Sequence, residues 1–313
     1  MIIPGRPIWQ QTMLRIRDPS KSIAFYKDIM GMTLIDKFDF PQYKFSLYFL
    51  TTLPENETYD LIPGTQESHD YLWTMNRVTL ELTHNHGTEK SDEKYHPGNE
   101  EGDGFGHVAF NCEDIYNATE LLEEKGVAFR KKPNEGRMPG IAFALDPDGY
   151  SVELLKRSSA CASEIKNYFN FSQTMLRVKD IDKSIAFYES FGLKVLRKKN
   201  YGSFTNAFMG MEDELNISSS DADDPINRDK SKWTDADAKE ALMRRFLPVL
   251  ELTHNHGTEK DENFKHYNGN EAGRQGFGHI GFLVDDVYES CDAIRTLGYG
   301  FKKEPDGGSM KGM

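Results

Sequence analysis

Leu80-Glu-Leu-Thr-His-Asn-His-Gly-Thr-Glu-Lys90 occurs twice in this chain, and the second copy, Leu250–Lys260, is identical at every position. Three further motifs return in the same order. Gln11-Thr-Met-Leu-Arg15 reappears as Gln173-Thr-Met-Leu-Arg177, Lys21-Ser-Ile-Ala-Phe-Tyr26 as Lys183–Tyr188, and Gly104-Phe-Gly-His107 as Gly276–His279. Ordered self-similarity of this kind is the sequence signature of a repeated architecture. The chain is therefore predicted to be a fused tandem duplication.

The order of the repeated motifs predicts how the chain is divided. We expect one domain over residues 1–157, a short polar linker over 158–168 and a second domain over 169–313. A chain of 313 residues is long enough for two such domains, each with a hydrophobic core of its own.

The second copy differs from the first at two places. It stops at Ser309-Met-Lys-Gly-Met313, where the first copy continues through further predicted strands, so we expect a C-terminal truncation of about one hairpin. It also carries an insertion at 218–239, rich in Asp, Ser and Lys, which is typical of a solvated loop with a short helix near 234–246. The acidic run 221–224 is interpreted as solvated surface.

Hydrophobic periodicity within each copy predicts a strand, a helix and three strands, in that order, twice. Gln11–Arg17 alternates with a period of two, and Asp18-Pro19 supplies an N-cap and a first-turn proline for a helix that runs through Ile29. The other elements of the first copy are expected as strands at 44–50, 77–83, 107–111, near 128, at 141–145 and at 150–155, and as a helix at 115–125. The fold class is therefore α+β, with about four tandem βαβββ modules in curled, mostly antiparallel sheets, the last module being truncated.

The predicted strands carry unusual polar groups on one face. Gln11 and Arg15 share a face of the first strand, and Glu81 lies on the polar face of a later one, whereas the alternate positions are apolar. His107 and Glu153 lie in the middle of predicted strands, among apolar neighbours. A buried charge without a partner is costly, and metal coordination is one way to satisfy such groups. The polar faces are therefore expected to line a site.

Composition excludes several classes of protein. The net charge of −12 argues against a nucleic-acid partner, because phosphate recognition relies on basic excess. Cys112, Cys161 and Cys291 are too far apart for a Cys-x-x-Cys pair, so neither a disulfide framework nor a thiolate zinc site is expected. The sequence shows neither a signal peptide nor a membrane span. We expect a cytoplasmic protein with no membrane association.

Taken together, the motifs Gln-Thr-Met-Leu-Arg, Leu-Glu-Leu-Thr-His-Asn, Gly-Phe-Gly-His and Asp-Pro-Asp-Gly-Tyr-Ser-Val-Glu resemble those of the eukaryotic glyoxalase I family, which has the vicinal oxygen chelate fold. The resemblance covers essentially the whole chain, twice. It implies a lactoylglutathione lyase, which isomerises the hemithioacetal of glutathione and methylglyoxal to S-lactoylglutathione with the help of a divalent metal ion.

The resemblance also implies two metal sites, each built from both copies. In that family one Gln, one His and two Glu hold the metal. Matched by position, one site would consist of His107, Glu153, Gln173 and Glu251, and the other of Gln11, Glu81 and His279 without a fourth carboxylate. An all-nitrogen and oxygen set suits zinc, or nickel or cobalt. The first site is expected to be complete and the second incomplete.

The mechanism that the resemblance implies is metal-assisted proton transfer through an enediolate. A carboxylate beside the metal moves the proton from C1 to C2 of the hemithioacetal. Glu153 is expected to be the main base, and Glu251 is expected to serve the opposite face of the substrate.

Family resemblance further implies residues that hold the carboxylates of glutathione. These are Arg177, Asn255 and Lys131 at the complete site, and Arg15, Asn85 and Lys303 at the other. One position departs from the family, where an Arg precedes Gly-Phe-Gly-His. The first copy has Asp103 there, and the second has Gln275 with Arg274 one residue earlier. An Asp at this position is expected to repel a substrate carboxylate and weaken glutathione binding.

Two motifs that could suggest metal binding have plainer interpretations. His84-Asn-His86 and its copy at 254–256 are expected to follow the end of a strand, with His84 on the face opposite Glu81, as structural residues. Asp146-Pro-Asp-Gly149 is expected to form a hairpin turn before the Glu153 strand and not a calcium site.

Two other functions remain open at this point. A ring-cleaving dioxygenase of the same fold would need two His and one carboxylate for ferrous iron, whereas the first strand offers Gln. A binding protein that has kept the fold and lost turnover is the other alternative, and the completeness of the His107, Glu153, Gln173 and Glu251 set argues for activity. Because both halves of each site lie in one chain, we expect a monomer acting on a small-molecule substrate.

Overall fold

The computed structural model describes residues 2–136, 138–158, 168–211, 224–227 and 229–307. The predicted linker, apart from 158 and 168, lies outside the described residues, as do 221–223 of the acidic run and the last residues, 308–313. Among the described helices none is long and apolar enough to cross a membrane.

The elements follow the predicted order, strand, helix and three strands. The first module contains β1 (Ile8–Ile16), α1 (Pro19–Ala24), the π-helical turn η1 (Phe25–Ile29), β2 (Thr33–Phe40), β3 (Phe45–Thr51), α2 (Gln66–Thr74) and β4 (Thr79–Asn85). The second contains β5 (Phe105–Cys112), α3 (Ile115–Glu124), β6 (Phe129–Lys131), β7 (Ala142–Leu145) and β8 (Ser151–Lys156). The third contains β9 (Asn170–Arg177), α4 (Ile181–Ser190), β10 (Leu193–Asn200), β11 (Phe204–Met211), α5 (Asp235–Arg244) and β12 (Val249–Asn255). The fourth begins with β13 (Phe277–Leu283) and α6 (Val287–Thr296).

Short 3-10 turns complete the described structure. They are η2 (Thr88–Lys90), η5 (Pro225–Asn227), η6 (Lys230–Lys232) and η7 (Thr258–Lys260). The predicted helix in the insertion is confirmed as α5, which begins after an N-cap, Thr234, whose side chain accepts a hydrogen bond from the Asp237 amide.

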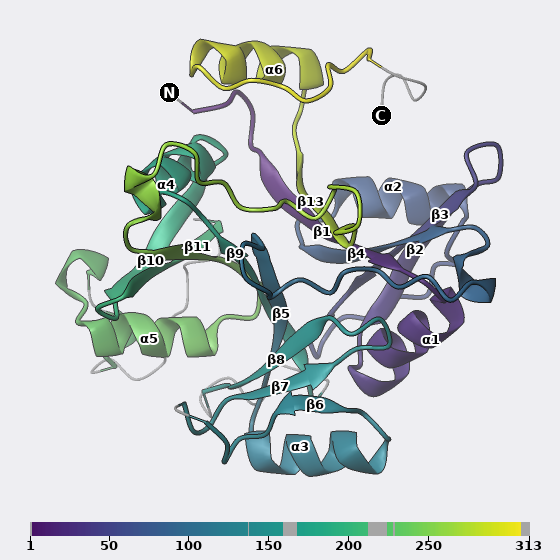
Figure 1. Cartoon of the computed structure of the whole chain (residues 1–313), viewed down its shortest axis with the longest axis horizontal. Helices are drawn as coiled ribbons and strands as arrows, with labels where there is room; N and C mark the ends of the chain where they lie inside the picture. Colours follow the sequence, from purple (N-terminus) through teal and green to yellow (C-terminus); the bar gives the residue numbers. More distant parts are fainter. Residues whose placement is uncertain (1, 137, 159–167, 212–223, 228, 308–313) are drawn as a thin grey trace.

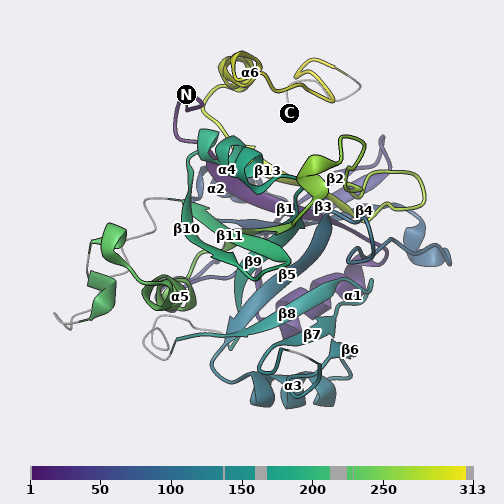
Figure 2. The same ribbon diagram turned by 60° about the vertical axis from the view of Figure 1, so that its left-hand side comes forward.

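Each sheet combines strands from both copies. One sheet has the order β10-β11-β12-β9-β5-β8-β7-β6, so the second module continues into the third, and the other has the order β13-β1-β4-β3-β2. The central pairing of the larger sheet is antiparallel, between β5 and β9, which run side by side through the middle of the molecule (Figures 1 and 2). The predicted α+β fold is confirmed, while the proposed domain boundaries at 157 and 169 remain a prediction.

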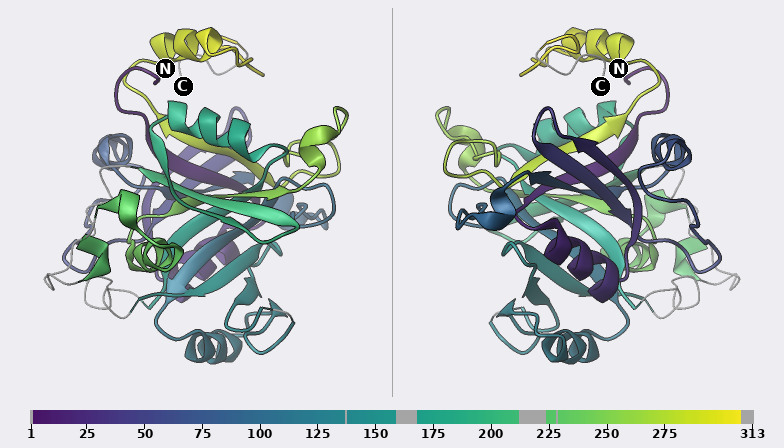
Figure 3. Two further views of the ribbon diagram at one scale, coloured as in Figure 1. Left: turned by 90° about the vertical axis from the view of Figure 1, so that its left-hand side faces the viewer. Right: turned by 90° about the vertical axis from the view of Figure 1, so that its right-hand side faces the viewer.

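Equivalent residues of the two copies meet in the centre of the molecule. The hydroxyls of Thr12 and Thr174 lie 2.8 Å apart, and the rings of Phe105 and Phe277 stack with centroids 5.0 Å apart and an interplanar angle of 6°. Residues that contact their own counterparts are the mark of a two-fold axis. The two copies are thus related by an internal pseudo-two-fold, with α3 and α6 at opposite ends of the molecule (Figure 3).

The first predicted helix differs from expectation in its second half. It begins as predicted, with the Asp18 side chain accepting from the Ser20 amide and Pro19 in the first turn. After Ala24 it widens into a π-helical turn, in which the Met30 amide donates to the Phe25 carbonyl at 2.9 Å. Such turns are rare, and the apolar periodicity of the sequence carries no signal for them.

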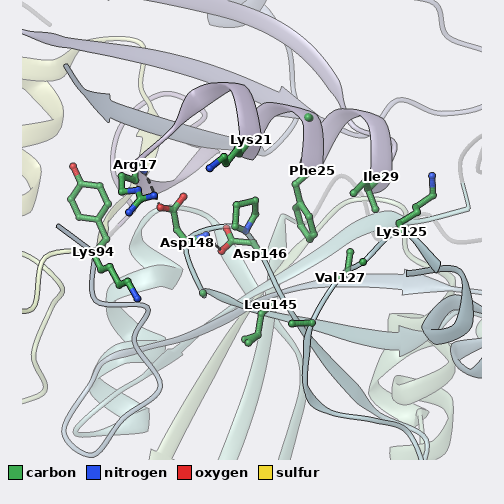
Figure 4. Close-up of a pocket in the computed structure, with 16 residues that line it drawn as sticks. Arg17, Lys21, Phe25, Ile29, Lys94, Lys125, Val127, Leu145, Asp146 and Asp148 are labelled. Atoms are coloured by element: carbon green, nitrogen blue, oxygen red, sulfur yellow. Dashed lines mark hydrogen bonds between the residues drawn. The ribbon is translucent and has the colours of Figure 1, made fainter. Parts of the chain in front are cut away.

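The Asp146-Pro-Asp-Gly149 turn joins β7 to β8, as predicted, and it holds the first helix against the second module. Tyr26 donates a hydrogen bond to Oδ2 of Asp146 at 2.9 Å, and Ser22 donates to Oδ2 of Asp148 at 3.0 Å. The turn borders a cavity of about 650 Å³ beneath α1, in which Asp146 and Asp148 face the helix (Figure 4). Burial, followed by the charge of Asp148, raises the pKa of Asp146 to about 7. The turn that precedes the Glu153 strand is therefore anchored by a carboxyl that titrates near neutrality.

We predict that this carboxyl makes stability depend on pH. An acid whose pKa is higher in the folded than in the unfolded chain binds more protons when folded, so its contribution to the free energy of unfolding falls as the pH rises from about 4 to 7, by up to about 1.4 kcal/mol per unit. Asp146→Asn removes the titration. The free energy of unfolding of the wild type minus that of the variant, measured by urea unfolding at pH 5 and pH 7.5, should be lower at pH 7.5. A difference that does not change with pH would contradict the assignment.

Candidate metal centre

The four predicted ligands of the complete site come together on neighbouring strands. His107 lies on β5, Glu153 on β8, Gln173 on β9 and Glu251 on β12, which are adjacent in the sheet order β12-β9-β5-β8. Nε2 of His107 is 3.1 Å from Oε2 of Glu153 and 3.6 Å from Oε2 of Glu251. Nε2 of Gln173 lies 2.9 Å and 2.7 Å from the same two oxygens. All four side chains are buried and converge on one point.

Strand register explains why all four side chains share one face. Met175 of β9 pairs with His107 on one side and with Glu251 on the other. Gln173 lies two residues before Met175, and Ala109, two residues after His107, pairs with both Gln173 and Glu153. Residues that pair directly, or that are two positions apart, point to the same side of a sheet. The cluster therefore follows from the pairing of β5 with β9.

The electrostatics of the cluster reflect two carboxylates packed against one imidazole. Burial alone would lower the pKa of His107, but Glu153 and Glu251 outweigh it and raise this pKa to about 9. Burial raises the pKa of Glu251, and the nearby charge of Glu153 adds to that shift. The two carboxylates thus favour the protonated, positively charged form of His107.

The donor set fits a divalent metal ion. The ligand atoms of His107, Glu153 and Glu251 lie within 4.8 Å of one another. The amide nitrogen of Gln173 faces the two carboxylates. The two ends of an amide have nearly the same shape, so a rotation of 180° would turn the oxygen toward a metal ion instead. One imidazole and three oxygen ligands form a set that zinc and its neighbours accept.

The second predicted site is assembled as far as the described chain allows. Nε2 of Gln11 donates to a carboxylate oxygen of Glu81 and lies 2.9 Å from Nε2 of His279, which is itself 3.4 Å from Glu81. The His279 side chain is 48% exposed, against 7% for His107. No described residue of the fourth module takes the place of Glu153. This site therefore has three predicted ligands, of which His279 is exposed and Glu81 is buried, whereas all four predicted ligands of the first site are buried.

The carboxylate of Asp103 is held by two basic side chains. Asp103 is 3% exposed, and its carboxylate pairs with Nε2 of His96 at 2.7 Å and with Nη1 of Arg274 at 2.9 Å. Burial would raise the pKa of Asp103, but the Glu100 amide, His96 and Arg274 outweigh it and lower this pKa. An arginine from the other copy thus neutralises the charge of Asp103, and the expected weakening of glutathione binding stays a prediction. His96, Glu100 and Asp103 form a second group of possible metal donors, but one Asp103 oxygen is already held by Arg274.

Arg177 and Asn255, two of the predicted glutathione-binding residues, are the last residues of β9 and β12. Arg177 donates to the Asn99 side chain, and its counterpart Arg15 donates to Oδ1 of Asn270 at 2.8 Å. Asn255 is exposed at the end of β12. Lys131 and Asn85 are the last residues of β6 and β4. Lys131 donates to the carbonyls of Met138 and Ile141, and Asn85 donates to the Tyr95 hydroxyl. Lys303 is exposed in the segment after α6.

A cavity of about 570 Å³ opens from the cluster in the opposite direction. It begins at Glu153, Gln173 and Glu251 and reaches the strand ends that lie away from Arg177 and Asn255. Its further lining is mixed, with Ile141, Leu155, Phe208, Leu242 and Val249 beside Ser172, Arg197, Asn206 and Arg245. Sequence analysis missed these residues. The sequence signal that could have revealed Asn206 is a difference between the copies. Asn206 pairs with Thr253 on the strand of Glu251, whereas the first copy has Leu47 at the equivalent position.

The two histidine pairs are placed differently from expectation. His84 and His254 lie inside β4 and β12, so the prediction that they follow the strand was wrong. Nε2 of His84 lies 2.9 Å from Glu89, and Nε2 of His254 lies 3.0 Å from Glu259. Each is three residues from the cluster glutamate on its strand and therefore points to the other face, as predicted.

Comparison with known proteins places the chain in a family. The model of the Glyoxalase/Bleomycin resistance protein/Dioxygenase superfamily matches residues 9–154 and 170–313. The chain therefore belongs to this superfamily, and it contains the domain twice.

Full-length relatives narrow the similarity to one member of that superfamily. A lactoylglutathione lyase of Schizosaccharomyces pombe is 38% identical over 304 residues, which cover 96% of this chain and 89% of that protein. Glyoxalase I of Saccharomyces cerevisiae is 37% identical, with coverage of 96% and 90%. The crystal structure of glyoxalase I from Zea mays superposes with a TM-score of 0.62 at 27% identity, covering 96% of this chain and 83% of that one. The predicted resemblance is confirmed.

We predict that metal binding expels a proton from the cluster. Because the pKa of His107 is raised to about 9, the metal-free imidazole carries a proton at pH 7.5, and a metal can bind only when that proton leaves. Calorimetric titration of metal-free protein with zinc in buffers of different ionisation enthalpy should show net proton release at pH 7.5 that declines toward pH 9.5. His107→Gln should lose this release, and wild-type binding without proton release would contradict the raised pKa.

Proposed function

We propose that this chain is a glyoxalase I, a lactoylglutathione lyase that isomerises the hemithioacetal of glutathione and methylglyoxal to S-lactoylglutathione. The observation that carries the proposal is the buried cluster of His107, Glu153, Gln173 and Glu251, contributed by both copies. The similarity to full-length lactoylglutathione lyases from two yeasts supports it.

His107, Glu153, Gln173 and Glu251 would hold the metal ion, for which we propose zinc. The bound ion supplies Lewis-acid stabilisation of the negative charge that develops on the substrate oxygens when the C–H proton is removed. The chain's own contribution is a buried cluster in which Glu153 and Glu251 both lie next to His107. At the second site, Gln11, Glu81 and His279 offer the same chemistry without the second carboxylate.

Proton transfer is assigned to the carboxylates. Glu153 takes the proton from C1 of the hemithioacetal and returns it to C2, and Glu251 faces the other side of the substrate carbon. A glutamate suits both steps because the conjugate acid formed in the first is the donor needed in the second.

Glutathione is proposed to lie along the strand ends beyond the cluster. Arg177 and Asn255 would hold its γ-glutamyl end and Lys131 its glycyl carboxylate, with Arg15, Asn85 and Lys303 in the same roles at the second site. Guanidinium and ammonium groups are the usual partners of carboxylates. With glutathione on that side, the methyl group of the substrate points toward the cavity lined by Ile141 and Phe208. Because both parts of the complete site lie in one chain, a monomer can carry out this reaction.

We predict that turnover depends on Glu153 of the complete cluster and not on Glu81 of the second cluster. Zinc-loaded protein should form a thioester from methylglyoxal plus glutathione, followed by absorbance. Glu153→Gln should lower kcat by about 10²–10⁴-fold, because the general base is gone while the size of the side chain is kept. Glu81→Gln, the same change at the incomplete cluster, where Glu81 is the counterpart of Glu251, should keep at least half of the rate.

Two results would overturn this proposal. If the two variants lose the same fraction of activity, catalysis is not centred on the complete cluster. If the wild type binds zinc and glutathione but forms no thioester, the chain is a binding protein of the same fold.

A further inference from the structure

Asn206 makes a hydrogen bond to one of the two cluster carboxylates. Its Nδ2 donates to Oε1 of Glu251 at 2.5 Å, and its own Oδ1 accepts from the Thr253 hydroxyl at 3.1 Å. Asn206 lies on β11, directly opposite Thr253 in the register, and it lines the cavity that opens from the cluster. The threonine fixes which end of the amide faces Glu251, because a hydroxyl that donates to Oδ1 leaves the NH₂ group for the carboxylate.

The first copy has no such donor. Leu47 pairs with Thr83 as Asn206 pairs with Thr253, so the two residues are structural equivalents. At that site the Thr83 hydroxyl donates to Oε1 of Glu81 at 3.0 Å instead. The amide is therefore a property of the complete cluster and not of the repeated fold.

This contact makes the two carboxylates of the cluster unequal. Oε1 of Glu251 is held by Asn206, and its Oε2 faces Gln173 at 2.7 Å. Glu153 also directs Oε2 into the cluster, at 2.9 Å from Gln173. Among the described residues, none donates a hydrogen bond to Oε1 of Glu153. Hydrogen bonds to charged groups are stronger than those between neutral groups and resist rotation of the carboxylate.

We infer that Asn206 is a positioning residue, which keeps Glu251 in one orientation as a fixed ligand and so leaves Glu153 as the carboxylate that can move during turnover. The inference rests on the proposed function for the reaction, but the fixing of Glu251 can be tested without it. Asn206 touches neither the predicted glutathione-binding residues nor Glu153 in the described structure. Its effect on metal release should therefore act through Glu251.

The decisive experiment is a double-mutant cycle between Asn206 and Glu251, read out as metal loss to a chelator. Asn206→Leu copies the residue of the first repeat, and Asn206→Asp keeps the shape but removes the donor. In the wild-type background each should speed zinc release about 10-fold, as expected for the loss of one hydrogen bond to a charged ligand. In the Glu251→Ala background each should change the release by less than 2-fold. Leu47→Asn is the matched control and should leave release from the complete cluster unchanged.

Steady-state kinetics give a second, independent readout. Asn206→Leu should lower kcat while the KM for the hemithioacetal stays within 2-fold of wild type, because the residue does not contact the proposed glutathione site. Equal acceleration of zinc release in both backgrounds, or no acceleration in either, overturns the inference. A wild type that forms no thioester but shows the predicted cycle removes the proposed function and leaves the fixing of Glu251 intact.

Discussion

The antiparallel pairing of β5 with β9 is the interaction on which the rest of the molecule depends. It joins the second module to the third, and it is the pairing through which Met175 comes to lie between His107 and Glu251. A sheet passes side chains to alternate faces, so a shift of one residue in this register would send Gln173 away from His107 and Glu153. The pseudo-two-fold contacts of Thr12 with Thr174 and of Phe105 with Phe277 hold the two sheets in the relation that this register requires. Cluster and fold are thus products of one strand pairing.

The cost of this arrangement is a concentration of buried charge. Two carboxylates lie 3.1 Å and 3.6 Å from one imidazole, and both raise the pKa of His107. Two other buried carboxyl groups also have partners. Asp103 pairs with His96 and Arg274, and Asp146 accepts a hydrogen bond from Tyr26. In the second cluster His279 is exposed, so solvent can stabilise its charge. In the complete cluster His107 and both carboxylates are buried, and a divalent metal ion would balance the two negative charges.

Much of this could be predicted from the sequence because the decisive signals are local. The alternation of the strands predicts which side chains share a face. The resemblance of the Leu-Glu-Leu-Thr-His-Asn and Gly-Phe-Gly-His motifs to the glyoxalase I family implies that His107, Glu153, Gln173 and Glu251 form one set. Asn206 was not predicted, because its contact with Glu251 spans 45 residues and depends on the register of β11 with β12. The Asp103–Arg274 pair joins residues 171 apart, and sequence alone could see only the unfavourable charge of Asp103. The π-helical turn after Ala24 shares the periodicity of an ordinary amphipathic helix and leaves no trace in it.

The most direct test of the central claim, that both copies build one buried metal site, is the position of the ion itself. Crystals of the zinc-loaded protein should be measured at the zinc absorption edge. The account predicts the strongest anomalous peak within ligand distance of His107, Glu153, Gln173 and Glu251, and a weaker peak or none beside the exposed His279. A principal peak at His96 and Asp103, or equal peaks at the complete and the second cluster, would contradict it.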